Sequence, residues 1–141
     1  MAGLALLLTA CSGTRPDHLG VTGGRLAPCP DSPNCVSSFA TDAEHKVEPL
    51  TFQGEPEAVM QAIQEELARR DRVEIVTQQP HYLYAEFTSR VFRFVDDVEF
   101  LIDAETKTLH FRSASRLGRS DLGVNRERVE SIRKALTVKN L

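Results

Sequence analysis

Apolar residues recur every three or four positions in two stretches of the chain, which is the spacing of an amphipathic helix. The first stretch carries its stripe at Val59, Met60, Ile63 and Leu67. Because a proline at position 56 suits the first turn of a helix, we expect this helix to span residues 56–70. The second stripe, at positions 129, 132 and 136, predicts a C-terminal helix with Asn125 as its N-cap.

Four stretches between these helices alternate apolar and polar residues, as strands with one buried face do. They form two hairpins, 73–78 with 83–87 and 98–103 with 108–113, and residues 47–52 fit a further strand. Strands joined by short turns run antiparallel, and two amphipathic helices need a sheet face to cover. We therefore expect an α+β domain with an antiparallel sheet of four to five strands and both helices packed on one face.

The second hairpin has one register that suits both faces of the sheet. With residues 104–107 as its loop, Phe100 lies opposite Phe111 in an apolar row, and Glu99 lies opposite Arg112. A slip of one residue would break the apolar match and the charge match together. We expect Phe111 in the core and Arg112 outside it, on a salt-bridged polar face.

Two parts of the sheet allow more than one arrangement. In the first hairpin, pairing Ile75 with Ala85 would set Glu74 opposite Glu86, which is unfavourable, so its register stays open. Residues 90–97 are rich in apolar side chains for a connection. They either continue the preceding strand or form a loop that lays two phenylalanines over the core.

Length and charge narrow the class of protein. A chain of 141 residues suits one domain with an ordinary core. Its 17 basic and 20 acidic residues give no basic field, so we expect no nucleic-acid partner. The glycine-rich strand-to-helix fingerprint of dinucleotide and P-loop folds does not occur, and we expect no cofactor.

The N-terminus carries a targeting signal. An apolar run over residues 1–10 is too short for a bilayer-spanning helix, which needs about 20 residues, and it ends in LTAC at 8–11. This ending resembles the lipobox of bacterial lipoproteins, in which the cysteine is lipidated and the preceding residues are removed. No lysine or arginine precedes the run, as a secretory leader requires, so either the true start codon lies upstream or the signal is weak. The alternative to a lipoprotein signal is a buried N-terminal segment with an unrelated Cys11.

These features divide the chain into three parts. We expect a signal peptide at residues 1–11 with Cys11 lipidated, a glycine-rich flexible tether at 12–27, and a single domain at 28–141. The residue after the cysteine is a serine, and an aspartate at this position would retain a lipoprotein at the inner membrane. We therefore expect the protein at the outer membrane of a bacterial cell envelope, facing the periplasm.

Two cysteines, Cys29 and Cys35, flank a proline-rich turn. Outside the cytoplasm such a pair is expected to form a disulfide, and lipidation of Cys11 accounts for the third cysteine. A metal site is the alternative, but two thiols lack the further ligands that zinc needs. We therefore expect a disulfide and no metal.

The densest polar passage runs from residue 112 to residue 128 and contains five arginines. Together with the acidic residues of the preceding strand, it makes a candidate polar or anion site. Its members are Asp96, Asp97, Glu99, Arg112, Ser115, Arg116, Arg119, Asp121, Asn125 and Arg126.

Arginines at 126 and 128 place positive charge at the positive end of the C-terminal helix dipole. One interpretation is an internal clasp, in which Asp121 and either Asp96 or Asp97 neutralise the arginines. The other is a bound phosphate or carboxylate, held by Arg116 or Arg119 and the free N–H groups of the helix. We favour the clasp.

The mature part of the chain resembles the domain-of-unknown-function family 1499, found in bacteria and plant plastids. Three motifs carry the resemblance: CPDSPNCVSS at 29–38, VDDVEF at 95–100 and RSASRLGRSDLGVNRERVESIR at 112–133. The resemblance implies one domain in an envelope-like compartment, and it implies no activity.

A binding or scaffold role, with a protein partner or a small anionic ligand, is the function we expect for this membrane-tethered domain. The alternative is a hydrolase-like or small-ligand enzyme that uses Asp96, Asp97, Arg112 and Ser115. No nucleophile-elbow sequence surrounds any serine, which argues against a hydrolase. A deep cleft at these residues would favour a small ligand, and a flat face would favour a protein partner.

Overall fold

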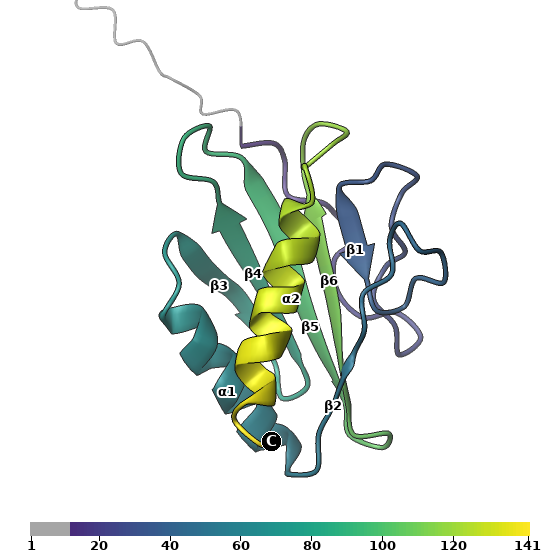
Figure 1. Cartoon of the computed structure of the whole chain (residues 1–141), viewed down its shortest axis with the longest axis vertical. Coiled ribbons are helices and arrows are strands. Elements are labelled where there is room, and N and C mark those ends of the chain that lie inside the picture. The colour runs from purple at the N-terminus through teal and green to yellow at the C-terminus, as the bar shows by residue number, and fades with distance from the viewer. Residues whose placement is uncertain (1–11) are drawn as a thin grey trace, which may run out of the picture.

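The computed structural model describes residues 12–141, which form one antiparallel sheet with two helices across one of its faces (Figure 1). The predicted α+β class is confirmed, and six strands are present in this part of the chain. The elements are β1 (Cys35–Ser37), β2 (Leu50–Thr51), α1 (Pro56–Ala68), β3 (Val73–Gln78), β4 (Tyr82–Thr88), β5 (Val95–Asp103), β6 (Thr108–Ser115) and α2 (Val124–Thr137).

The sheet is built outward from the long β5–β6 hairpin. Its strand order is β1-β6-β5-β4-β3, and β2 pairs with β6 beyond the end of β1. Both β1 and β2 therefore extend one edge of the sheet. The sequence predicted β2 within 47–52 but not β1, whose three residues show no alternation of burial.

The main core fills the space between the helices and the sheet. Both predicted helical stripes are buried there, with Ile63 of α1 and Ile132 of α2 fully enclosed. Pro56 occupies the first turn of α1, as expected, and the helix ends two residues before the predicted end at residue 70. Phe100 and Phe111 meet edge to face within this core, with ring centroids 5.9 Å apart.

The predicted register of the second hairpin is confirmed. Phe100 pairs with Phe111, and Glu99 pairs with Arg112. The placement of Arg112 outside the core was wrong, because its side chain is only 2% exposed. The sheet face opposite the helices is covered at this point, since the chain before β1 contacts Glu99 and Arg112 there.

The first hairpin adopts the register that seemed unfavourable. Ile75 pairs with Ala85, which sets Glu74 opposite Glu86, and a register shift follows at Val76. The carboxylate of Glu86 is bound by two arginines from elsewhere in the chain, Arg15 and Arg116. These contacts offset the repulsion that the pairing alone would cause.

The connection between the hairpins does not lay its phenylalanines over the core. β5 begins at Val95, and the preceding loop leaves Phe92 and Phe94 exposed, stacked on each other with ring centroids 5.6 Å apart. None of the helices within residues 12–141 is long and apolar enough to cross a bilayer.

Candidate functional site

The sheet face away from the helices carries a layer of buried charge. Because residues alternate across a strand, odd-numbered positions of β5 and even-numbered positions of β4 and β6 point to this face. We call this set the ion-pair layer, and it consists of Glu86, Asp97, Glu99, Arg112 and Arg116.

Arg116, the residue directly after β6, binds the acidic groups in one half of the layer. Its guanidinium donates to Asp97 over 2.7 and 3.0 Å and also contacts Glu86. Tyr84 donates to Asp97 over 2.6 Å. The hydrogen bond to Asp97 raises the pKa of Arg116, whereas burial and Asp97 raise the pKa of Tyr84, so the phenol stays neutral and donates. The carboxylate of Asp97 therefore accepts hydrogen bonds from both Arg116 and Tyr84.

Arg112 belongs to the other half of the layer and is poorly satisfied. Its guanidinium approaches Glu99 at 3.4 Å and His18 at 3.4 Å. Glu99 has better donors, because Tyr82 and the backbone N–H of Gly20 reach it over 2.9 and 2.8 Å. The Nε of Arg112 is buried and has no hydrogen-bond partner among the described residues. A buried donor without a hydrogen bond is rare in proteins, and it lowers the stability of the fold.

Residues 12–26 cover the ion-pair layer, and we call them the N-terminal strap. The expected flexible tether at 12–27 is thus not what the structure contains. Arg15 binds Glu86 over 2.8 Å, Gly20 binds Glu99, and Leu26 is buried in a small apolar cluster with Tyr82. The glycine-rich composition that indicated a tether also lets an irregular segment follow the sheet closely.

A cavity of about 240 Å³ opens between the strap, the disulfide turn and β6. Arg112 and Arg116 line it, and Asp97 is the one acidic residue in its described lining. Polar groups of Ser32, Asn34 and Ser115 complete the wall, together with His18 and several apolar atoms. The arginine with the unpartnered Nε therefore borders a cavity whose lining carries more positive than negative charge.

A second polar network lies on the helix side of the sheet. Arg128 binds Asp96 over 2.6 Å and donates to Asn125 over 2.8 Å. Asn125 in turn accepts from Ser113 over 2.6 Å and donates to Ser115 over 2.8 Å. The network ties the start of α2 to β5 and β6, and it contains one part of the expected clasp, the ion pair between Asp96 and Arg128.

The predicted helix cap is wrong, because Asn125 lies inside α2 and Gly123 is the N-cap. Gly123 has a φ of 83°, which glycine adopts without strain. Asp121 accepts hydrogen bonds from the backbone N–H groups of Gly123 and Asn125, over 2.9 and 3.0 Å. Asp121 therefore satisfies the helix terminus rather than an arginine.

Two predicted members of the site lie apart from it. Arg126 donates to the carbonyl oxygens of Lys46 and Glu44 over 2.6 and 2.8 Å, so it holds the loop before β2. Arg119 is exposed in the loop before α2 and makes no ion pair among the described residues. Elsewhere on α2, Glu130 forms an ion pair with Arg133 at 3.0 Å.

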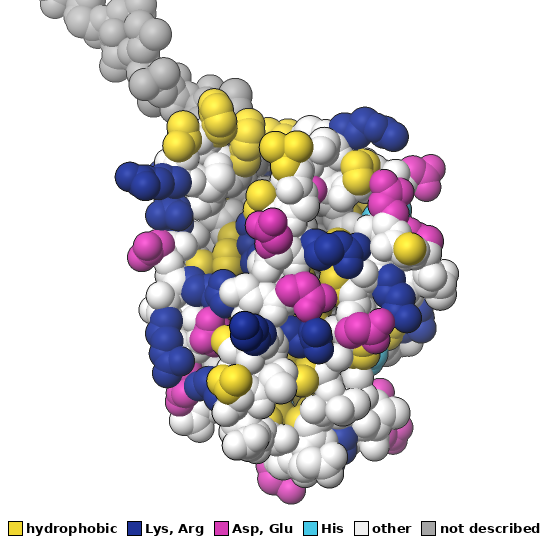
Figure 2. Space-filling view, viewed as in Figure 1, with side chains coloured by type: hydrophobic (Ala, Val, Ile, Leu, Met, Phe, Trp, Pro, Cys, Tyr) yellow, Lys and Arg dark blue, Asp and Glu magenta, His cyan; other side chains and the backbone are white. Residues whose placement is uncertain are grey.

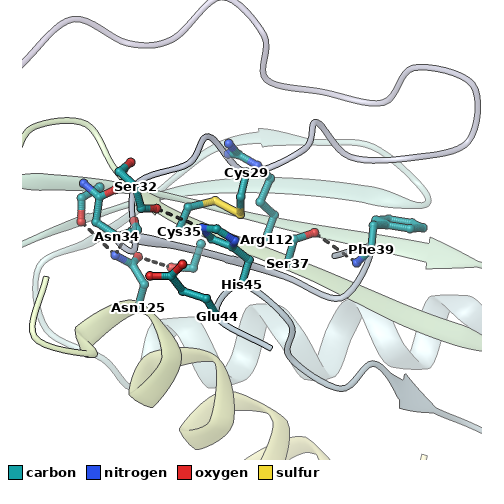
Figure 3. Close-up of a disulfide and its surroundings, with 12 residues drawn as sticks. Cys29, Ser32, Asn34, Cys35, Ser37, Phe39, Glu44, His45, Arg112 and Asn125 are labelled. Atoms are coloured by element: carbon teal, nitrogen blue, oxygen red, sulfur yellow. Dashed lines mark hydrogen bonds between the residues drawn. A yellow bond between two sulfur atoms is a disulfide. The ribbon is translucent and has the colours of Figure 1, made fainter. Parts of the chain in front are cut away.

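The predicted disulfide is confirmed, with Cys29 and Cys35 bonded at a Cα–Cα distance of 5.6 Å (Figure 3). His45 holds the same turn, since its Nε2 lies 3.1 Å from the carbonyl oxygen of Ser32 and its Nδ1 lies 2.6 Å from Asp42. Burial lowers the pKa of His45, but these two acceptors outweigh it and the pKa is raised.

The described residues offer little for catalysis or metal binding. Ser38 lies 3.2 Å from Nδ1 of His110, but its hydroxyl also bridges the backbone N–H and carbonyl of Phe111. The candidate metal ligands Asp42, Glu44 and His45 cluster within 4.8 Å, yet both ring nitrogens of His45 are engaged. These contacts identify structural roles for both histidines.

Sequence reasoning missed three residues of the ion-pair layer and its surroundings: Tyr82, Tyr84 and Glu86. Their alternation with the buried apolar side chains of β4 was visible in the sequence, and the pairing of β4 with β5 in the structure places them on the face with Glu99 and Arg112. What the alternation could not show was that the strap would bury that face.

The model of a family described as "Protein of unknown function (DUF1499)" matches residues 25–136. The matched span begins at the end of the strap and includes the disulfide turn, the whole sheet and nearly all of α2. The comparison with curated proteins gave no match.

Proposed function

Since the chain belongs to the DUF1499 family, whose description assigns no activity, we infer its function from the site. We propose that it is a lipid-anchored binding domain of the cell envelope. It accepts a small ligand that carries an anionic group. The ligand occupies the cavity between the strap, the disulfide turn and β6. Its carboxylate or similar acceptor binds Arg112.

The unpartnered Nε of Arg112 is the observation that carries this proposal. A guanidinium presents several donors in a planar fork and prefers a bidentate acceptor such as a carboxylate. The long contacts of Arg112 to Glu99 and His18, both at 3.4 Å, leave capacity for such a group. A cavity rather than a flat face favours a small ligand over a protein partner.

Binding fits this site better than catalysis does. An acid–base enzyme needs a carboxylate that is free to exchange a proton. Asp97 is held by Arg116 and Tyr84, and Asp96 is held by Arg128. Ser115 accepts a hydrogen bond from an amide and has no histidine beside it among the described contacts. The residues named for the hydrolase-like alternative therefore include neither a free base nor an activated nucleophile.

The anchor and the compartment rest on the sequence, because Cys11 and the residues before it lie outside the described part of the chain. The disulfide between Cys29 and Cys35 supports an oxidising compartment, since such bonds are rare in the cytoplasm. An envelope location, at the outer membrane and facing the periplasm, is consistent with both features.

The Nε–H resonance of Arg112 in a two-dimensional nuclear magnetic resonance spectrum tests the ligand site. The Arg112→Lys variant assigns the signal and keeps the charge. Titration with acetate, succinate or phosphate at constant ionic strength is expected to shift this resonance and leave that of Arg69, an exposed arginine outside the cavity, unchanged. Equal shifts at both arginines, or no shift at Arg112 with any of these anions, would contradict an anion site in the cavity.

A further inference from the structure

One end of the molecule exposes apolar side chains on two neighbouring connections. The β4–β5 loop (89–94) and the β6–α2 loop (116–123) both reach this end (Figure 1). We call their exposed apolar side chains, with the first residue of α2, the end patch. Its members are Val91, Phe92, Phe94, Leu117, Leu122 and Val124.

The exposure in the end patch is large for apolar residues. Leu122 is 92% exposed and Phe92 is 74% exposed. A groove of about 200 Å³ between the two loops continues the patch, lined in part by Phe94, Leu117 and Val124. Single exposed apolar residues need no explanation, but a contiguous group on two loop tips marks an interaction surface.

The charge around the patch is positive. Arg90 and Arg93 lie on the first loop and Arg119 on the second, all exposed, and none of them makes an ion pair with a described residue. Asp121 is the one acidic residue on the two loops, and it is bound to the N–H groups at the start of α2. The combination of apolar tips and unopposed arginines matches an anionic lipid surface.

The described chain begins at the same end. A Cβ placed on Gly13 would lie 3.2 Å from the side chain of Leu117, so the start of the strap touches the patch. Figure 1 shows this start beside the two loops, and Figure 2 shows hydrophobic side chains gathered at this end. Cys11, the predicted lipid attachment point, is two residues before Gly13. An acyl chain on Cys11 would hold this end against the bilayer.

We propose that the end patch is a membrane-docking surface, which inserts Phe92, Leu122 and their neighbours at the lipid headgroup level while the three arginines contact anionic phospholipids. The proposal builds on the lipid anchor of the proposed function, but it adds that the folded body has one fixed face toward the membrane. A lipid anchor on Cys11 would hold the chain at the bilayer without fixing the orientation of the folded body, and the end patch is the second contact that fixes it.

Tryptophan fluorescence tests the docking, because the natural chain has no tryptophan. Phe92→Trp reports on the patch, and Val138→Trp is a matched control, since the two positions are 74% and 72% exposed and Val138 follows the opposite end of α2. The full chain is reconstituted in vesicles of phosphatidylcholine with phosphatidylglycerol, with bromine-labelled acyl chains as quenchers. We expect a blue-shifted, strongly quenched tryptophan at position 92 and an unquenched one at position 138.

Further arms separate this proposal from the others. Flotation of the protein with the vesicles reports the lipid anchor independently. If no anchor forms, the same quenching measurement with added anionic vesicles tests the docking.

In the Phe92→Trp background, Leu122→Ser or the pair Arg90→Gln and Arg93→Gln should reduce the quenching at least threefold, whereas Val21→Ser should not. Equal quenching at positions 92 and 138 would overturn the proposal. So would a blue shift at 92 that depends on protein concentration without lipid, which would indicate a second copy as the occupant.

Discussion

At the scale of single residues, Arg112 has the most unusual environment in the domain. A guanidinium only 2% exposed, with one unpartnered N–H, is a group that proteins rarely bury. Its pairing with Glu99 followed from the sequence, because both strands alternate and the charges match. Its burial did not follow, since it depends on a segment about 90 residues earlier in the chain that contains no periodic pattern.

Glu99→Gln and Arg112→Met should each lower the free energy of unfolding by about 3 kcal/mol, because either change leaves a buried charge without its partner. The loss in the free energy of unfolding of the double variant should be smaller, by at least about 1 kcal/mol, than the sum of the losses of the two single variants. Urea unfolding measures all three. The exposed pair Glu130–Arg133 is the control and should couple by less than about 1 kcal/mol. Additive losses at the buried pair would show that it is not coupled.

His45 should make stability depend on pH. Its folded pKa is raised, because the acceptors Ser32 and Asp42 outweigh burial. A raised folded pKa stabilises the fold fully below the unfolded value of about 6.5, and this stabilisation is lost as the pH rises through the folded value. The melting-temperature gap between wild type and His45→Gln should therefore be largest near pH 5.5 and shrink by pH 8.5. A gap that grows with pH would contradict a protonated His45.

At the scale of elements, the sequence predicted both helices and the register of the second hairpin, because each depends on a local repeating pattern. It missed β1, since Cys35–Ser37 is too short to show a period and gains its partner from β6. It also misplaced the start of α2. Asn125 is a good capping residue in isolation, but the folded chain uses Asp121 for the free N–H groups and Asn125 for the buried network.

Asp121→Ala should lower the free energy of unfolding by about 1 kcal/mol or more, as the loss of a capping carboxylate does. Phosphate at fixed ionic strength should leave the backbone N–H resonances of Gly123 and Asn125 unchanged, because Asp121 already occupies the start of α2. Glu127→Ala, in the first turn of the same helix, is a suitable control. A shift of these resonances with phosphate, together with a neutral Asp121→Ala, would favour a bound anion over the clasp.

At the scale of the whole molecule, the strap, the cavity and the end patch are close together. Gly13 touches Leu117 in the end patch, and Pro16 and His18 line the cavity. A membrane anchor at Cys11 would therefore act on the segment that covers the ligand site. The sequence could not predict this proximity, because it arises from where an irregular segment lies on the folded sheet.

Lipidation is the prediction on which this arrangement depends. When the protein is expressed in a bacterium with its complete signal peptide, the wild-type chain should incorporate radiolabelled palmitate. The Cys11→Ala variant should not. Cys29→Ala with Cys35→Ala is the control, because those two thiols form the disulfide and should not change the labelling. Label in Cys11→Ala equal to that of the wild type would exclude the anchor at this position.

The strap also affects the order in which the domain folds. Its contacts to Glu86, Glu99 and Arg112 join residues 71, 79 and 94 positions apart. Closing such long loops is entropically unfavourable until the sheet is in place, and contacts distant in sequence slow folding. The charged groups of β4, β5 and β6 therefore stay hydrated until the strap docks on the completed sheet. The strap, which is synthesised before the sheet, is thus among the last parts of the domain to reach its native position.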